Sequence, residues 1–412
     1  MAKHTTNSLL RQRGDKQHAR VTEIELFFDL VFVFAVTQLS HTLLKDLTLD
    51  GALHTGLLFL AVWWVWIYTS WITNWLDPDR VPVRLMLFAL MLAGLVLSAS
   101  LPLAFGSKGL VFAVVYAGMQ VGRTLFMLWT IRQPQSDTQR DLVRNFQRVL
   151  VWLALSAVFW LAGGLADGAD PAGRLLYWLL ALGLEYVSPA LGFWVPGLGR
   201  STTADWNVEG GHLAERCSLF IIIALGESIL VTGATFAELA WSAPTTLAFA
   251  TAFVGSVAMW WIYFNIGAER GSHHISKSAD PGRIARMVYT YVHLLIVGGI
   301  IVGAVGDELV LAHPNGHLDG GAVATIVGGP VLFLFGNLIF KWLSSPQPWL
   351  PLSHMAGLSL SGALLVLLIF YHGLTPLMLC GAMTAILIMV AVWETVSLRQ
   401  PLVEEGQGRV DL

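Results

Sequence analysis

Residues 25–40 read ELFFDLVFVFAVTQLS, the centre of an apolar run that extends over residues 22–43 and holds the acids Glu25 and Asp29. A helix of about 20 mainly apolar residues can cross the hydrocarbon core of a bilayer. The apolar core of a cleavable signal peptide is shorter than this run, and two acids do not fit such a core. We therefore expect residues 22–43 to form a transmembrane helix that stays in the mature chain.

The composition of the whole 412-residue chain agrees with a membrane protein, because 55 % of its residues are hydrophobic and only 12 % are charged. The 17 Trp and 40 Gly fit bilayer interfaces and close contacts between membrane helices. A formal charge of -3 without a clustered basic surplus argues against a nucleic-acid partner. The two cysteines lack the spacing of a metal site, a redox pair or a disulfide framework. We predict no metal site, and the cofactor stays unknown.

Eleven more apolar runs follow the first, each bounded by Pro, Gly or charged residues. We therefore predict an all-α, polytopic integral membrane protein with 12 transmembrane helices. The predicted spans are 22–43, 54–76, 83–104, 109–131, 147–166, 174–196, 214–237, 244–267, 284–310, 321–343, 354–372 and 375–397.

The basic residues divide unequally between the two sides that twelve spans create. The outer segments hold only Lys45, Lys108 and Arg174, Arg123 falls within a span, and every other Lys and Arg falls on the inner side. Positive charge is retained on the cytoplasmic side of a membrane. We therefore expect both termini to be cytoplasmic.

The second half of the chain repeats features of the first. Residues 215–230, ERCSLFIIIALGESIL, align with residues 25–40, and WWVWIYTSW at 63–71 resembles MWWIYFNIG at 259–267. Halves with an even number of helices share one orientation, so we predict two parallel six-helix repeats. The predicted segments are a cytoplasmic N-terminal tail (1–21), the first repeat (22–196), a cytoplasmic linker (197–213), the second repeat (214–397) and a cytoplasmic C-terminal tail (398–412).

Three stretches resemble the bacterial low temperature requirement protein A (LtrA) family: ELFFDLVFVFAVTQLSH at 25–41, LEYVSPALGFWVPGLGRS at 184–201 and HLAERCSLFIIIALGESIL at 212–230. The resemblance extends over nearly the whole chain, and H-x-x-E-R-x-x-L-F-x-I-I-x-L-G-E-S is its most specific element. It implies a multi-pass protein of the inner cell membrane that is connected with growth at low temperature. It implies no particular reaction, because the family lacks a settled biochemical activity.

The first span is also similar to the endolysosomal potassium channel family, in which an Arg and a Phe-Ser-Asp motif open each of two six-helix repeats. Here Arg20 precedes the pair Phe28-Asp29, but the Ser is missing and Leu219 stands where the second repeat would carry the Asp. This similarity implies an ion channel of two six-helix repeats as an alternative.

Charged side chains within the spans are candidate functional residues, because each costs roughly 2.5–3.5 kcal/mol in hydrocarbon unless it has a partner or reaches water. Asp29 and Arg123 stand seven and eight residues from the cytoplasmic ends of their predicted spans, so both are about 10–12 Å deep. We predict an intramembrane ion pair between Asp29 and Arg123. Such a pair either locks two helices together or takes part in gating.

A second group of candidates lies near the predicted midplane. Glu227 and Glu185 are acids at this depth, Ser228 adjoins Glu227, and His293 lies at a similar depth in another span. Buried carboxyl groups and an imidazole can exchange protons. We predict that these residues line a substrate or ion pathway, against the alternative that Glu227 and His293 only bond to neighbouring helices.

A third group opens the seventh predicted span, where His212, Glu215 and Arg216 stand close together. Glu25 is the counterpart of Glu215 in the first repeat. These four residues are predicted to form a cytoplasmic gate, and the alternative is that they anchor the helix at the interface.

We take a transporter of a small ion or solute as the first hypothesis for function. The alternatives are an ion channel with the same architecture and a membrane-embedded lipid-modifying enzyme, whose acids would serve as general acid and base. A catalytic signature is absent from the sequence, so enzyme activity stays uncertain. The expected partners are the lipid bilayer and the small ion or solute, with a second copy of the chain as a further candidate.

Overall fold

The computed structural model describes residues 8–11, 21–134, 136–166, 171–201, 210–265, 286–345 and 349–398. Most of the two predicted tails, the middle of the predicted linker and Arg20 lie outside these residues. Within them the regular structure is helical, and the β-bridges are the isolated pairs Leu10 with Leu76 and Val195 with Gly199.

The described residues contain twelve α-helices, and each overlaps one predicted span. Eleven helical segments are long and apolar enough to cross a membrane. A 3₁₀ turn (η1, Leu101–Leu103) extends α3, and a π-helical segment (η3, Arg286–Val292) leads into α11. The helices are α1 (Glu23–Lys45), α2 (Leu49–Trp75), α3 (Val81–Ser100), α4 (Gly109–Thr130), α5 (Asp137–Leu165), α6 (Pro171–Val187), α7 (Gly210–Glu238), α8 (Ala243–Phe264), α11 (His293–Ala312), α12 (Gly320–Leu343), α13 (Leu352–Phe370) and α14 (Pro376–Leu398).

Helix α6 differs from its prediction, because it ends at Val187 and not near residue 196. Pro189 disfavours helical backbone at the residue before it. Gly192 and Phe193 then take left-handed backbone, with φ of 62° and 48°. The helix therefore has 17 residues, about 26 Å in length, slightly less than the thickness of the hydrocarbon core.

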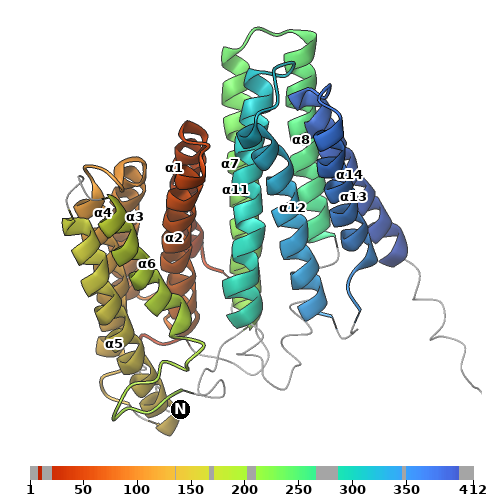
Figure 1. The fold of residues 1–412 in the computed structure, drawn as a ribbon. Coiled ribbons are helices and arrows are strands. Elements are labelled where there is room, and N and C mark those ends of the chain that lie inside the picture. Colours follow the sequence, from red (N-terminus) through yellow and green to blue (C-terminus); the bar gives the residue numbers. More distant parts are fainter. Residues whose placement is uncertain are drawn as a thin grey trace, which may run out of the picture. The chain divides into compact units, whose positions relative to one another are not determined.

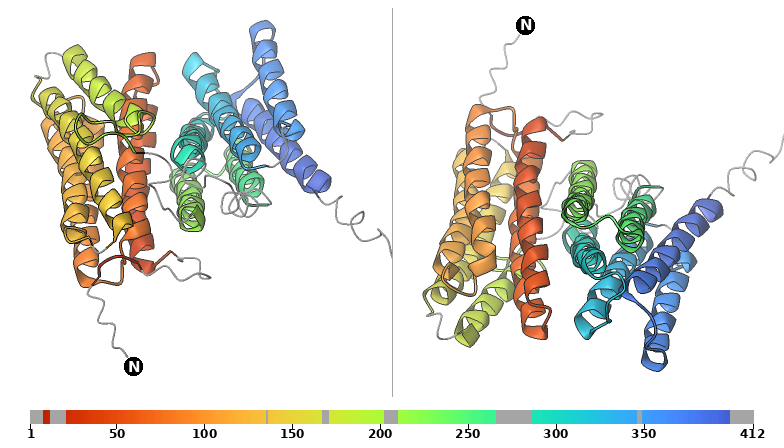
Figure 2. Two further views of the ribbon diagram at one scale, coloured as in Figure 1. Left: turned by 90° about the horizontal axis from the view of Figure 1, so that it is seen from below. Right: turned by 90° about the horizontal axis from the view of Figure 1, so that it is seen from above.

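The chain divides into two compact units. Unit 1 comprises Met1–Ile223 with Ser276–Thr290, and unit 2 comprises Ala224–Ile275 with Tyr291–Leu412. In unit 1, α1 packs on α2 and α3, and α3 to α6 pack in chain order; α4 and α5 lie side by side in every view (Figures 1 and 2). In unit 2, α12 packs on α11, α13 and α14, and α8 packs on α14 and α11. The predicted segments 22–196 and 214–397 stay a prediction.

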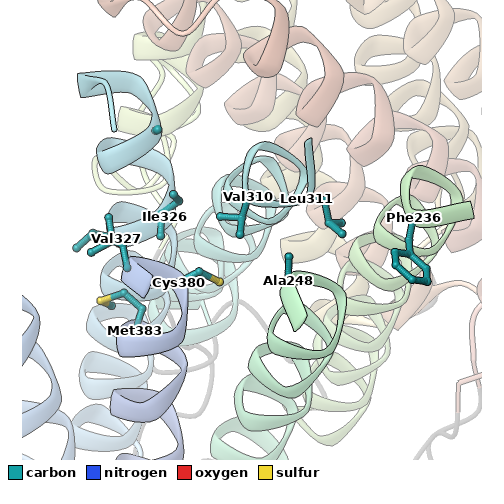
Figure 3. Packing of buried hydrophobic residues seen from close by; sticks show 10 residues of the cluster. Phe236, Ala248, Val310, Leu311, Ile326, Val327, Cys380 and Met383 are labelled. Atoms are coloured by element: carbon teal, nitrogen blue, oxygen red, sulfur yellow. The ribbon is translucent and has the colours of Figure 1, made fainter. Parts of the chain in front are cut away.

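Glycines bring the backbones of α11 and α12 into contact within unit 2. A Cβ added to Gly299 would lie 2.4 Å from Phe333 N, and one added to Gly329 would lie 2.4 Å from Gly303 N. Side chains cannot fit at such a crossing. Next to it, Cys380 and Met383 of α14 lie beside Ile326 of α12 in the apolar cluster drawn in Figure 3.

An arginine joins helix ends within unit 1. The Arg174 guanidinium donates hydrogen bonds to four carbonyl oxygens, those of Ala104, Gly106, Gly163 and Ala166, at 2.7–3.1 Å. The last carbonyls of a helix lack helical partners and carry partial negative charge. Arg174 therefore fixes the end of α5 and the turn after α3.

Candidate functional site

Five ionisable side chains meet inside unit 1: Arg11, Glu25, Asp29, His212 and Arg216, here called the charge cluster. Arg216 lies at its centre and is fully buried. Its Nη1 donates to Glu25 Oε1 at 3.1 Å, and its Nη2 donates to Asp29 Oδ1 at 2.6 Å. The Arg216 guanidinium thus bonds to an acid at the start of α1 and to a second acid one turn further along the same helix.

Arg11 approaches the same acid from the segment before α1. Its Nη2 donates to Glu25 Oε2 at 2.9 Å, and its Nε donates to the carbonyls of Thr73 and Leu76. These carbonyls belong to the end of α2, where a cation is favoured by the helix dipole. Arg11 therefore ties residues 8–11 to both α1 and α2.

His212 is the third ionisable partner of Glu25. Its Nε2 lies 2.9 Å from Glu25 Oε1, and its Nδ1 lies 3.3 Å from the amide nitrogen of Asn74. These contacts fit a neutral imidazole that donates from Nε2 and accepts at Nδ1. The charge cluster then holds two guanidinium groups and two carboxylates, so that its charges balance.

The local sequence explains why Glu25 and His212 meet near helix starts. Glu25 is the third residue of α1, and its Oε2 accepts a hydrogen bond from the Thr22 backbone N–H at 2.9 Å, which is a capping-box contact. His212 is the third residue of α7. Glu215, which is exposed, accepts from the Val21 backbone N–H at 3.2 Å. The structure thus joins Glu25, His212 and Arg216 directly, and their role as a gate stays a prediction.

The predicted ion pair between Asp29 and Arg123 is wrong. Asp29 Oδ1 binds Arg216 and accepts a hydrogen bond from Trp66 Nε1 at 2.7 Å. Arg123 Nη1 donates instead to the Val65 carbonyl at 2.9 Å and to Thr69 Oγ1 at 2.7 Å. Equal depth along two helices does not specify the directions in which their side chains point. Here Asp29 binds the Trp66 indole, whereas Arg123 binds the neighbouring positions Val65 and Thr69 of the same helix.

The second polar group of unit 1 surrounds Glu185 in α6 and is called the Glu185 network. Both carboxylate oxygens accept hydrogen bonds, Oε1 from Ser156 Oγ at 2.5 Å and Trp160 Nε1 at 3.0 Å, and Oε2 from Tyr116 OH at 2.5 Å and Gln120 Nε2 at 3.3 Å. Four donors from α4 and α5 thus solvate one buried acid.

Arg123 joins the Glu185 network through Gln120. Its Nη2 donates to Gln120 Oε1, and the amide nitrogen of Gln120 donates to Glu185. Along this path the neutral amide of Gln120 separates the Arg123 guanidinium from the Glu185 carboxylate. The contacts of Glu185 fit a fixed internal acid better than an open pathway.

Unit 2 holds the other three residues of the predicted pathway. His293 and Glu227 are buried, and His293 Nε2 lies 2.9 Å from the Tyr263 hydroxyl. Ser228 lines a cavity of about 30 Å³, here called the unit 2 cavity. The predicted relay between Glu185, Glu227 and His293 stays a prediction.

The unit 2 cavity is enclosed by residues of α7, α8, α11, α12 and α14. Ser228 and Ser256 each stand at least eight residues, about 12 Å, from either end of their helices. The cavity therefore lies at membrane depth. Its polar lining consists of Ser228, Ser256, Asp307, Cys380 and Thr384.

Several of these residues lie outside the sets predicted from the sequence. Asp307 stands five residues before the end of α11, and such a position is easily interpreted as belonging to the outer loop. Ser256 and Thr384 are single small polar residues within apolar helices, which are common. The sequence signal available for the cavity was Glu227, an acid within an apolar run that directly precedes the cavity residue Ser228.

The loop before α12 contains His313, His317 and Asp319. Asp319 Oδ1 accepts a hydrogen bond from the Ala322 backbone N–H at 2.7 Å and so caps α12. Among the described residues, no group of three or more His, Cys, Asp or Glu side chains is placed to hold a metal ion.

Comparison with known proteins agrees with the membrane architecture. The family described as "Bacterial low temperature requirement A protein (LtrA)" matches residues 20–392. An uncharacterized protein of Rhizobium meliloti (strain 1021) is 42 % identical over 401 residues, which cover 97 % of this chain and 94 % of that protein. No solved structure matches the chain. With its eleven helices that could span a bilayer, the chain is a multi-pass membrane protein that belongs to the bacterial LtrA family.

Proposed function

We propose that this protein transports a small ion or a proton-coupled solute across the inner cell membrane. The observation that carries the proposal is the unit 2 cavity, which places Ser228 beside other hydroxyl groups and the Asp307 carboxyl at membrane depth. Polar groups cost free energy in hydrocarbon, and they are retained there mainly where they serve a pathway or a partner. Glu227, one residue before Ser228, is the acid proposed to act next to this cavity.

The charge cluster supports a second part of the proposal. It joins α1, α7 and residues 8–11 through side chains near the cytoplasmic ends of these helices. Breaking its contacts would free all three segments together. We propose that Glu25, His212, Glu215 and Arg216 act as a gate on this side.

The helix packing within each unit supports two parallel repeats. In the first half α3 packs on α4, α4 on α5 and α5 on α6; in the second half α11 packs on α12, α12 on α13 and α13 on α14. The second helix of each half also packs on the fourth and the sixth, as α2 does on α4 and α6, and α8 on α12 and α14. Each half also has a polar contact between its fourth and sixth helices, Tyr116 with Glu185 and Lys341 with Glu394. The basic residues favour cytoplasmic termini.

The proposal is tested by flux measurements with the purified full chain in liposomes. Proton, Na⁺ and K⁺ gradients are imposed one at a time, and ion movement is followed with entrapped fluorescent indicators. Glu227→Gln should abolish the flux without reducing the amount of folded protein, because a neutral amide cannot carry a charge or a proton. Glu238→Gln is the matched control, since Glu238 lies on the same helix but is exposed.

Two outcomes would each contradict a part of the proposal. Flux equal to that of empty liposomes under every gradient would contradict transport of these ions and favour the lipid-modifying enzyme. Flux that persists in Glu227→Gln would contradict the role given to this acid. A transporter and a channel differ in rate and saturation, since alternating access limits turnover whereas an open pore does not.

A further inference from the structure

We propose that the unit 2 cavity binds one small monovalent cation, with Asp307 as the charged ligand and the hydroxyls of Ser228 and Ser256 as neutral ligands. The proposal rests on the proposed transport function and names the class of ion. A cavity of about 30 Å³ has room for only about one or two water molecules. A cation held there must therefore be small and largely stripped of its hydration shell.

The two serines of the cavity are the first reason. Ser228 and Ser256 are only 3 % and 7 % exposed, and within the described residues neither hydroxyl bonds to another protein group. Other helical hydroxyls in this chain donate to the carbonyl one turn earlier, as Thr232 does to Ser228 O at 2.6 Å and Ser361 does to Gly357 O at 2.8 Å. Buried polar groups are normally bonded. A ligand in the cavity would supply the missing partner of both serine hydroxyls.

A helix irregularity supplies another oxygen atom. Pro330 lies inside α12 and has no N–H to donate, so the Ile326 carbonyl lacks its usual helical partner. Ile326 and Pro330 both line the cavity. Carbonyl oxygens released in this way coordinate cations in membrane proteins.

The charge of the site favours a monovalent ion. Asp307 contributes one carboxylate, and its hydrogen bond among the described residues comes from the weak donor Cys380 Sγ at 3.9 Å. Unlike Asp29, Asp307 makes no ion pair with a cation in this part of the chain. Calcium requires six to eight oxygen ligands, and magnesium usually keeps several of its waters. One carboxylate with a few neutral oxygens in so small a space suits Na⁺ or Li⁺.

Binding is measured on the purified full chain in detergent, with choline replacing the metal ion at constant ionic strength. Equilibrium binding of radioactive Na⁺ and the melting temperature are recorded against NaCl, LiCl and KCl. We expect saturable Na⁺ binding that Li⁺ displaces better than K⁺ does, and a melting temperature that rises over the same range. Asp307→Asn should abolish both effects, and Ser256→Ala should weaken binding about fivefold, the effect of one lost neutral ligand.

Ser361→Ala is the matched control, because Ser361 is also buried in unit 2 but bonds to the protein; its Na⁺ binding should be unchanged. If Asp307→Asn does not fold, Ser228→Ala and Ser256→Ala decide the test. Absence of saturable binding in the parent, or unchanged binding in the folded Asp307 or Ser256 variants, overturns the proposal and leaves water or a proton as the occupant. Binding without flux would contradict transport alone, whereas flux without binding would contradict this site alone.

Discussion

Replacing Arg216 by Met removes the cation that two buried acids share. Arg216, Glu25 and Asp29 all have fully buried side chains. Removing one partner of a buried ion pair costs about 3–5 kcal/mol, because the remaining charge stays buried without compensation. Glu25 keeps Arg11 and His212, whereas Asp29 keeps only the neutral Trp66 indole. We therefore expect Arg216→Met to lower the free energy of unfolding by about 3–5 kcal/mol, mainly through Asp29.

A double-mutant cycle isolates that contribution. Asp29→Asn removes the charge that Arg216→Met leaves uncompensated. The loss of unfolding free energy in the double variant should therefore be smaller than the sum of the two single losses by about 1–3 kcal/mol. The same cycle with Arg123→Met should give a coupling of less than about 0.5 kcal/mol, since Asp29 and Arg123 share no hydrogen-bond partner.

Unfolding of the purified variants in mixed micelles, followed by tryptophan fluorescence, measures these free energies. Additive effects of Asp29→Asn and Arg216→Met would refute the pairing described for the charge cluster. A large coupling between Asp29 and Arg123 would instead restore the pair predicted from the sequence.

Three further predictions concern other parts of the two units. Tyr116→Phe should lower the free energy of unfolding by about 1.5–3 kcal/mol, because it removes a donor to the Glu185 carboxylate. Tyr186→Phe loses only a hydrogen bond to the Leu60 carbonyl and should cost about 0.5–1.5 kcal/mol, so that equal costs would contradict a charged Glu185. Gly329→Ala should cost about 1–3 kcal/mol by overpacking the α11–α12 crossing, and the neighbouring Gly328→Ala, whose Cβ meets no atom within 4 Å, should not reduce stability. Lys341→Met should be strongly destabilising because it leaves Glu394 buried, and adding Glu394→Gln should recover part of the loss; no recovery in thermal unfolding would argue against the pair.

The helical spans could be predicted well because hydrophobicity and length determine them almost alone. The error at α6 has a local cause, since the apolar run of residues 174–196 continues past Pro189 while the backbone does not. An apolar residue in a left-handed turn, such as Phe193, carries no signal of its own. Composition therefore overestimates the length of a helix wherever an apolar turn follows it.

The polar partners were harder to predict, and the charge cluster shows why. Asp29 stands six residues after the start of α1, and Arg216 stands six residues after the start of α7, so both are about 9 Å from their helix ends. The sequence places the start of the seventh span at residue 214, four residues after Gly210, and so makes Arg216 too shallow. A small error in a predicted helix boundary thus leads to the wrong ion-pair partner for Asp29. Arg11, in a segment outside every span, gives no sign in the sequence that it contacts Glu25.

Glu25 and Glu185 of unit 1 differ from the polar lining of the unit 2 cavity in how their side chains are satisfied, and this difference separates residues that stabilise the fold from residues that could bind an ion. In unit 1, Glu25 and Glu185 each accept several hydrogen bonds from the protein, so a moving ion would have to displace a donor at these sites. In unit 2, the hydroxyls of Ser228 and Ser256 have no such donor or acceptor among the described residues, and Asp307 has only a thiol. A transported ion gains most where ligands are not already occupied. Glu25 and Glu185 therefore hold helices together, and we expect the ion at Asp307.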